Sequence, residues 1–216
     1  TIVCVSGGCD SIALSHVLWR RYGVQRLYHF NHGTPQADAM QSAVEAFAND
    51  FGMSLVIQKA NRKLKTEAEF REARLEYIRK IEGVWAMAHN LDEATESYCL
   101  RFFTGHPEYM PIPLTTDLAN GSKIIHPFLL NEKENIRKYI TRKGLTKYVV
   151  EDISNHDPKS SRRSWVRNEF LPLLQTKQML KKERHNMIMR QINLHNRVLS
   201  SDLVDLLNVS EDTIRR

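Results

Sequence analysis

Residues 6–11 read SGGCDS, a run that combines small size with polar side chains near the start of the chain. The run directly follows the apolar stretch Ile2–Val5 and precedes an amphipathic helical pattern. A strand, a tight glycine turn and a helix start direct backbone N–H groups and the positive helix end toward one point, where a phosphate can approach closely. The run therefore predicts a phosphate-binding turn with Ser6, Asp10 and Ser11 as its polar groups. The alternative is a plain glycine turn between strand and helix.

Two further polar clusters follow apolar runs that read as strands. Residues 29–33 (HFNHG) end the run at 27–30, and residues 88–90 (AHN) end the run at 84–88. The carboxyl ends of parallel strands meet at one edge of a sheet, which is where ligands bind in such folds. We therefore expect the three clusters to form a single site at that edge.

The elements that must position these clusters alternate between short β-rich runs and helical patterns. We expect strands at 2–5, 27–30, 55–58 and 84–88, and helices at 11–22, 36–51, 67–81 and 92–103. This βαβα order predicts an α/β fold, in which a parallel sheet carries helices on both faces.

The second half of the chain is less regular. Proline and glycine residues in 104–123 predict a long surface loop near the site, and Glu132–Lys143 predicts a helix closed by Gly144. A helix is expected at 162–174, a linker at 175–182 and a small separate helical unit at 183–216. The predicted domains are thus 1–174, which carries the catalytic site, and 183–216.

Composition favours a soluble globular protein, with 42% hydrophobic and 26% charged residues among 216. No apolar run approaches the roughly 20 residues that span a bilayer, so we expect no membrane segment. The three cysteines (Cys4, Cys9 and Cys99) form no CxxC pair, which favours a reducing, cytoplasmic location and argues against zinc or iron–sulfur sites.

The net charge of +6 is concentrated near the C-terminus. Residues 1–157 hold 19 basic and 19 acidic residues, whereas residues 158–216 hold 12 basic and 6 acidic ones. This placement predicts a polyanionic partner bound partly through the C-terminal region, and the alternative is a solubilising basic tail.

Taken together, residues 1–174 resemble the tRNA(Ile)-lysidine synthetase family, an N-type branch of the pyrophosphate-loop (PP-loop) ATPases with an adenine nucleotide alpha hydrolase-like fold. The motifs that carry the resemblance are SGGCDS at 6–11, HFNHG at 29–33, EAEFREAR at 67–74, HNLDEATES at 89–97, LRFFTG at 100–105, PFL at 127–129, DISN at 152–155 and the segment 163–167. Their order and spacing make the match specific. The chain departs from the family pattern at Asn90, Glu93, Ala94 and Thr104, all outside the glycine turn.

The resemblance implies an ATP-dependent tRNA-modifying ligase. Such an enzyme adenylates C2 of the wobble cytidine of tRNA(Ile) and joins free lysine to give lysidine, releasing AMP and pyrophosphate. ATP and Mg²⁺ are the implied cofactors, and tRNA and free lysine are the implied partners.

The family motifs also imply roles for individual residues. ATP binding falls to Ser6, Gly7, Gly8, Asp10, Ser11, His29 and Asn31. Mg²⁺ binding falls to Asp10 and Asp92, which with His89 and Glu96 form the predicted catalytic set. Substrate binding falls to Arg71, Arg74, Arg101, Asn155, Arg163 and Arg167.

Simpler interpretations exist for these residues taken singly. Acidic residues at 92, 93 and 96 would favour the start of a helix without any metal. Arg71 and Arg74 could form a solvated helix face, and His29 could satisfy backbone groups.

Residues 183–216 resemble the helix-turn-helix of DeoR-type regulators. Ser210 is suited to cap the second helix, where Thr213, Arg215 and Arg216 are the candidate DNA contacts. The alternative is a small helical module for packing. Two other functions therefore stay open: a nucleic-acid-binding regulator with an ATPase-like domain, or a PP-loop enzyme, such as a thiolase, that modifies another nucleobase.

Overall fold

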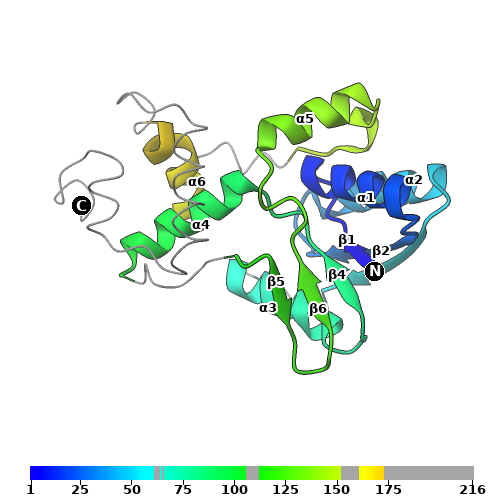
Figure 1. Ribbon diagram of the computed structural model, residues 1–216, viewed down its shortest axis with the longest axis horizontal. Helices are drawn as coiled ribbons and strands as arrows, with labels where there is room; N and C mark the ends of the chain where they lie inside the picture. The colour runs from blue at the N-terminus through cyan, green and yellow to red at the C-terminus, as the bar shows by residue number, and fades with distance from the viewer. Residues whose placement is uncertain (61–63, 65, 106–111, 152–160, 173–216) are drawn as a thin grey trace. The chain divides into compact units, whose positions relative to one another are not determined.

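In this computed structural model the described residues are 1–60, 64, 66–105, 112–151 and 161–172 (Figure 1). The chain divides into two compact units, which are described separately below. The first comprises residues 1–90 and 114–152, and the second comprises residues 91–113 and 153–216. The predicted linker and the predicted helix-turn-helix at 183–216, with Ser210, Thr213, Arg215 and Arg216, lie outside the described residues.

A six-stranded sheet forms the centre of the described part of the first unit, with strand order β3-β2-β1-β4-β6-β5. Its strands are β1 (Ile2–Cys4), β2 (Arg26–Asn31), β3 (Ser54–Lys59), β4 (Val84–Ala86), β5 (Thr115–Asp117) and β6 (Lys123–Ile125). All neighbouring pairs are parallel except β5 with β6, which is antiparallel. The predicted α/β fold is confirmed, with a sheet that is mostly parallel.

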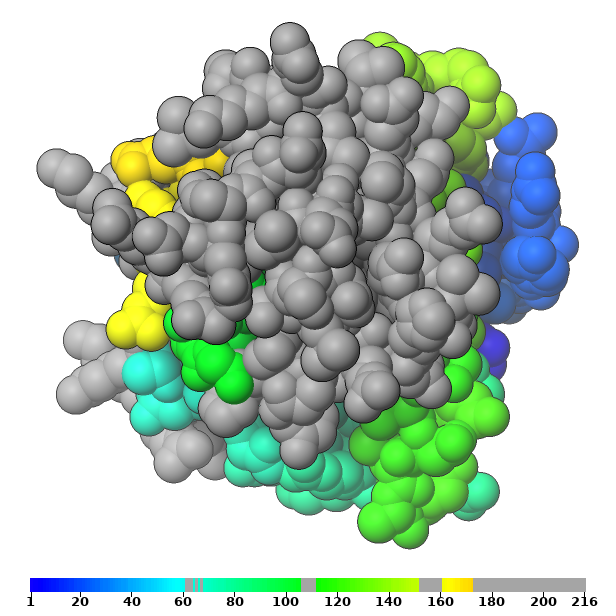
Figure 2. All heavy atoms as spheres, turned by 60° about the vertical axis from the view of Figure 1, so that its left-hand side comes forward, coloured from blue at the N-terminus to red at the C-terminus, as the bar shows by residue number. Residues whose placement is uncertain are grey.

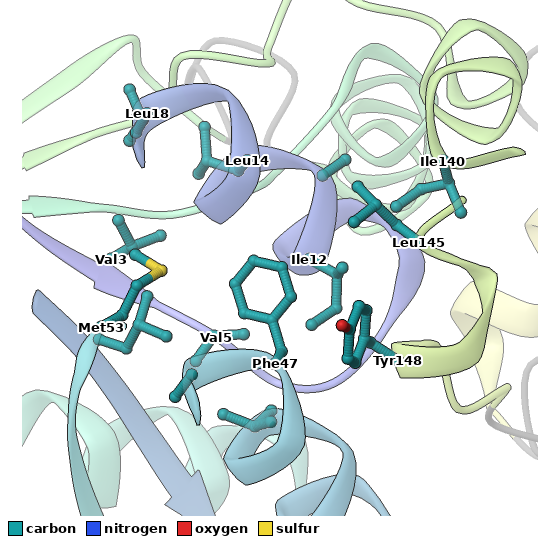
Figure 3. Close-up of a cluster of buried hydrophobic side chains, with 14 of the residues drawn as sticks. Val3, Val5, Ile12, Leu14, Leu18, Phe47, Met53, Ile140, Leu145 and Tyr148 are labelled. Carbon is teal, nitrogen blue, oxygen red and sulfur yellow. The ribbon is translucent and has the colours of Figure 1, made fainter. Parts of the chain in front are cut away.

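Helices cover both faces of this sheet. They are α1 (Cys9–Tyr22), α2 (Ala37–Asp50), α3 (Glu67–Ile78) and α5 (Lys133–Arg142), with a short 3-10 turn η1 (Thr146–Tyr148). One face packs against α1, α2, α5 and η1 through the side chains in Figure 3, including Val3, Phe47 and Ile140. The other face packs against α3 through a second cluster that includes Tyr28 and Trp85.

Neighbouring residues of β1 and of β4 belong to opposite clusters. Ile2 lies in the α3 cluster and Val3 in the α1 cluster, and Trp85 and Ala86 divide in the same way. Successive side chains of a strand point to opposite faces, so a strand covered on both sides is apolar at every position. This explains why these strands read as continuous apolar runs.

The predicted loop at 104–123 is wrong in its second half. The structure places β5 at Thr115–Asp117, and Lys123 begins β6. The buried Ser122 anchors this hairpin, because its hydroxyl donates to the Ile81 carbonyl (3.1 Å) and accepts from the Gly83 amide (3.2 Å). β5 reads TTD and β6 begins with Lys123, so neither forms the apolar run that indicates the equally short β1 and β4.

The order in which strands are added to the sheet reverses beside β1. The chain builds β1, β2 and β3 outward on one side and then returns to place β4 on the other side of β1. Residues 5–8 and 87–90 follow the carboxyl ends of β1 and β4 at this switch point. Ligands of open α/β sheets bind at such a point, so the fold supports the predicted location of the site.

The second unit contains α4 (Leu91–Phe103), α6 (Arg162–Trp165) and the π-helical segment η3 (Val166–Phe170). Phe103 packs edge-on against Phe170, with ring centroids 4.9 Å apart, and Trp165 stacks on Phe170. The helix predicted at 162–174 is confirmed as far as residue 172, with a π-helical stretch in its middle.

None of the helices in the described ranges is long and apolar enough to cross a membrane.

Candidate active site

The glycine turn is held by hydrogen bonds within its own six residues. The Ser11 hydroxyl accepts from the Ser6 amide (3.1 Å) and donates to the Gly8 carbonyl (3.0 Å). The Gly8 amide donates to the Ser6 hydroxyl (3.3 Å). Ser11 is buried and Ser6 is exposed, so Ser11 shapes the turn from beneath while Ser6 faces solvent.

Gly7 occupies a position that only glycine fits. Its φ is 88°, in the left-handed region, and a Cβ built there would lie 2.9 Å from the Met40 carbonyl oxygen at the start of α2. Its own carbonyl accepts a hydrogen bond from the Val150 amide (2.9 Å). The turn is therefore pinned on two sides by segments remote in sequence.

The N-terminus of α1 begins directly after this turn. Gly8 is the N-cap residue and supplies no side-chain hydrogen bond, so no side chain caps the first turn of the helix. Uncapped amides and the positive helix end favour an anion at this location.

Asp10, in the first turn of α1, forms an ion pair with Lys133, the first residue of α5. The two side chains are 15% and 30% exposed, so the pair is largely shielded from water. The other carboxylate oxygen of Asp10, Oδ1, is buried and has no hydrogen-bond partner among the residues that the structure describes. Sequence analysis missed Lys133, because only the packing of α5 on α1 brings it beside Asp10.

The two predicted ATP contacts at the end of β2 are both engaged inside the protein. His29 is buried, and its Nδ1 donates to the Val5 carbonyl (2.8 Å). The Asn31 amide nitrogen donates to Asp38 (3.1 Å) and Gln41 (2.9 Å), and its oxygen accepts from the Gly33 amide (2.9 Å). In this structure both side chains support the loops beside the glycine turn.

His32 lies beside a cation and two aromatic rings. Its ring is 4.9 Å from the ring centroids of Phe30 and Phe70. Burial, followed by the charge of Arg74 and then His29, lowers the pKa of His32 to about 4. Arg74 of α3 thus lies near the end of β2, whereas Arg71 is exposed on the same helix.

Two histidines meet beyond the ends of β4 and β6. The rings of His89 and His126 are 4.8 Å apart between centroids. His126 is buried, His89 is half-buried, and Asn90 beside them is 1% exposed. His126 follows β6 directly, a position that sequence analysis could have identified only by finding that strand.

Cys9 is not a reactive thiolate at neutral pH. Burial, followed by the negative charge of Asp10, raises the pKa of its thiol. The helix end beside it therefore does not activate this thiol.

In the second unit, two predicted site residues bind each other. Both oxygens of Glu96 accept from Arg167, from Nε at 2.7 Å and from Nη2 at 2.8 Å. Glu96 is 2% exposed, so this bidentate pair is shielded from solvent. Arg163 of α6 donates to the hydroxyl of Ser97, which lies next to Glu96 on α4 (3.1 Å). These contacts join α4 to the segment 162–170.

The other predicted residues of the second unit lie on α4. Asp92 and Glu93 occupy its first turn and Arg101 its last, each suited to the helix dipole. Asn155 lies outside the described residues. Asp10 and Asp92 belong to different units, and their shared Mg²⁺ site stays a prediction.

A parallel sheet with a pinned glycine turn at its switch point defines a nucleotide-binding α/β protein. Residues 1–174 match the PP-loop domain family, and the chain belongs to that family. Membership implies that it binds ATP.

Several curated relatives are named tRNA(Ile)-lysidine synthase. The relative from Actinobacillus pleuropneumoniae serotype 3 is 31% identical over 180 residues, 80% of this chain and 42% of the relative. The Neisseria gonorrhoeae protein is 30% identical over 79% of this chain and 39% of its own length, and the Thermus thermophilus protein is 28% identical over 81% and 35%. The chain thus spans about two fifths of the length of these relatives.

A solved structure shares the fold. It is the U34-tRNA thiolase NcsA from Methanococcus maripaludis with its [4Fe-4S] cluster, which superposes with a TM-score of 0.52 at 14% identity. The likeness covers 80% of this chain and 70% of that one, and at this identity it concerns the fold alone.

Proposed function

We propose that this chain is an ATP-dependent tRNA-modifying ligase of the lysidine type. In the proposed reaction ATP adenylates the carbonyl oxygen on C2 of the wobble cytidine of tRNA(Ile), and pyrophosphate leaves. The ε-amine of free lysine then attacks C2, displaces AMP and gives up a proton. Membership of the PP-loop family supports the use of ATP, and relatives named tRNA(Ile)-lysidine synthase support tRNA and lysine as substrates. The observation that carries the proposal is the pinned glycine turn at the switch point of the sheet.

The pyrophosphate part of ATP is assigned to the turn and to the N-terminus of α1. Gly7 lacks a side chain where the backbone is crowded, and the exposed Ser6 can donate its hydroxyl to a phosphate oxygen. The first-turn amides of α1 supply further donors. Anchoring of the turn by Ser11 means that these donors need little rearrangement when a phosphate arrives.

Asp10 and Lys133 are proposed to have separate roles toward bound ATP: Asp10 binds Mg²⁺, and Lys133 binds a phosphate oxygen. Mg²⁺, when bound, neutralises phosphate charge and prefers carboxylate, phosphate and water oxygens. The buried Oδ1 of Asp10 fits one such ligand position. Lys133 already lies against the other Asp10 oxygen, so its ammonium group can transfer to a phosphate oxygen without crossing a large distance.

The remaining roles are proposals for the second unit. Asp92 is a candidate second carboxylate for Mg²⁺. Because both Glu96 oxygens accept from Arg167, we assign Glu96 first to holding that guanidinium in place and only second to orienting the lysine amine. Arg101, Arg163 and Asn155 are assigned to substrate phosphates or to the lysine carboxylate.

His89 is the proposed proton carrier of the first unit. It follows β4 at the switch point, and its ring neighbour His126 restricts its orientation. An imidazole can hold or pass a proton near neutral pH, which suits loss of a proton from the incoming amine.

The first prediction concerns Asp10. Purified protein given ATP, lysine and a tRNA(Ile) transcript should release AMP and pyrophosphate. Omission of tRNA should abolish both products, and omission of lysine should abolish AMP release and limit pyrophosphate to about one turnover. Asp10→Asn should reduce the rate by about a hundredfold or more, because a charged phosphate and metal partner is lost. Asp117→Asn, an exposed hairpin carboxylate paired with Lys123, is the matched control and should retain the wild-type rate.

Mass analysis of the tRNA nucleosides identifies the product. A lysyl-cytidine mass in the reacted tRNA supports the proposal. ATP consumption with a different modified base would instead identify another nucleobase as the acceptor. No ATP consumption together with binding to a DNA duplex would favour the regulator function and would refute the ligase.

A further inference from the structure

A basic pocket lies in the first unit, away from the glycine turn. Its volume is about 500 Å³, and the residues that line it are Val17, Arg20, Arg21, Tyr139, Arg142 and Lys143. Four of these six residues are cationic and none is acidic. None of the four cations forms an ion pair within the part of the chain that the structure describes.

The pocket lies where two parallel helices end. Asp10 and Lys133 join the N-termini of α1 and α5, and His16 bonds to Tyr139 (2.7 Å) farther along. The helices therefore run side by side in the same direction, and their last turns supply the basic residues (Figure 1). Figure 2 shows α5 (yellow-green) at the upper right of the molecule and the β5–β6 hairpin (green) at the lower right.

The pocket lies away from the phosphate-binding turn. Arg20 follows Asp10 by ten positions along α1, which corresponds to about 15 Å at roughly 1.5 Å per residue. A phosphate group bound at the turn therefore does not also contact the pocket.

The positive charge of the pocket exceeds what helix capping requires. Basic residues commonly offset the negative helix C-terminus, but each terminus carries only about half a charge. Four cations against two termini leave an excess of about three positive charges. The pKa of the neighbouring His16 is lowered, first by burial and then by the positive charges of Arg20 and Lys143. Two of the pocket cations therefore act on a side chain of α1.

The polar groups of the pocket favour phosphate over a nucleobase. The Tyr139 hydroxyl is already bonded to His16, and Arg142 covers the Tyr139 ring with its guanidinium carbon 5.8 Å from the centroid. Tyr139 is the only aromatic among the described residues that line the pocket, and one face of its ring lies under this guanidinium. Exposed guanidinium and ammonium groups are the donors that bind backbone phosphates independently of sequence.

We propose that this pocket binds backbone phosphates of an RNA, so that the RNA contacts the first unit along α1 and α5 as well as at the active site. The identification of that RNA as tRNA rests on the proposed function. The pocket would then contribute affinity and orientation and take no part in the chemistry.

The test compares two variants that remove equal charge. Arg20→Gln/Arg142→Gln removes one cation from each helix in the pocket, and Arg79→Gln/Lys123→Gln removes two exposed cations elsewhere on the same unit. Binding of a fluorescent tRNA(Ile) transcript is measured by anisotropy over a range of salt concentrations, and binding of labelled ATP is measured in parallel. Because Arg20 also contacts Tyr139, Arg21→Gln/Lys143→Gln provides a second pocket variant that leaves that contact in place.

We expect both pocket variants to bind tRNA about tenfold more weakly and to reduce the slope of log K against log salt by about 1–2, since each lost phosphate contact contributes about 0.7–0.9. ATP binding should not change. Equal loss in the control variant overturns the proposal, as does weaker binding of ATP or inorganic phosphate with unchanged tRNA binding. Tighter binding of a DNA duplex than of tRNA overturns the assignment to RNA.

These outcomes are separable from failure of the proposed function. If the wild-type protein binds tRNA through the pocket but forms no lysyl-cytidine, the ligase is refuted and the pocket stands. If lysyl-cytidine forms equally well in all variants at low tRNA concentration, the pocket is refuted and the ligase stands.

Discussion

Gly7 is held by two independent constraints. Its backbone adopts the left-handed region, and its Cα faces the Met40 carbonyl too closely for any side chain. Either constraint alone costs a substituted residue roughly 1 kcal/mol or more. Together they make this glycine the position at which the turn tolerates change least.

We predict that Gly7→Ala destabilises the protein by about 2–4 kcal/mol and weakens ATP binding strongly, because Met40 or the turn must shift. Urea unfolding and titration with labelled ATP measure the two effects. Gly52→Ala is the matched control: its φ is 62° with nothing within 4 Å, so it should lose only about 1 kcal/mol and bind ATP normally. Equal effects of the two substitutions would contradict the steric argument.

Residues that act through local sequence were predictable, and those that act through long-range pairing were not. The turn at 6–11 is shaped by neighbours within five positions, such as Ser6 and Ser11, so its sequence contains the information. Lys133 reaches Asp10 across 123 positions. Glu96 and Arg167 were each predicted as site residues, but their mutual pairing depends on how α4 meets η3.

At the scale of elements, the Glu96–Arg167 pair links α4 to the π-helical segment. Such segments are rare and occur often at functional sites. The nearby rings of Phe103, Trp165 and Phe170 add apolar packing to the same contact. The orientation of Arg167 is thus determined jointly by a carboxylate beneath it and by the packing of its helix.

We predict that Glu96→Ala destabilises the second unit by about 2–4 kcal/mol, because Arg167 loses the partner of a shielded bidentate pair. A double-mutant cycle with Arg167→Met, followed by urea unfolding, should give a coupling energy of about 1–3 kcal/mol. The exposed pair Glu72–Arg79 serves as control, and its cycle should give less than about 1 kcal/mol. Additive effects of Glu96→Ala and Arg167→Met would refute the coupling.

The hairpin of β5 and β6 leads to another prediction. Ser122→Ala should cost about 1–3 kcal/mol, because the Gly83 amide loses its side-chain acceptor and the Ile81 carbonyl keeps only the Trp85 indole as a side-chain donor. Ser42→Ala removes an exposed hydroxyl bond to the Asp38 carbonyl and should cost little. Thermal unfolding of the two variants compares them directly, and similar melting temperatures would contradict this role of Ser122.

The order of elements up to α4 was predictable because each strand there lies in an apolar run and each helix shows its period. The hairpin was not, since the polar β5 reads TTD and β6 begins with Lys123, although both are as long as β1 and β4. The parallel packing of α1 and α5, which creates the basic pocket, is likewise invisible in either helix alone.

At the scale of the whole molecule, stability should depend on pH through buried histidines. The pKa of His32 is lowered to about 4, below its ordinary value near 6.5, and the pKa of His29 is lowered as well. Between these values the unfolded chain binds protons that the folded chain does not. These histidines therefore do not reduce the free energy of unfolding above about pH 6.5, and they reduce it progressively as the pH drops toward 4.

We predict a loss of about 1–2 kcal/mol from His32 between pH 7.5 and 5, a range in which most carboxylates remain charged. Urea unfolding at roughly these two pH values measures it. The His32→Gln variant should show a smaller pH dependence, although the substitution itself lowers stability by removing ring contacts with Phe30 and Phe70. An unchanged pH dependence in this variant would contradict the assignment.

The remote contacts of the glycine turn also determine at what stage of protein synthesis the site can be completed. The carbonyl of Gly7 is bonded to Val150, and Asp10 is paired with Lys133, so both partners leave the ribosome long after the turn itself. During synthesis the turn therefore exists for most of the time with only its internal hydrogen bonds. A nascent chain that stops before Lys133 would contain all of SGGCDS and would still lack the partners of Gly7 and Asp10.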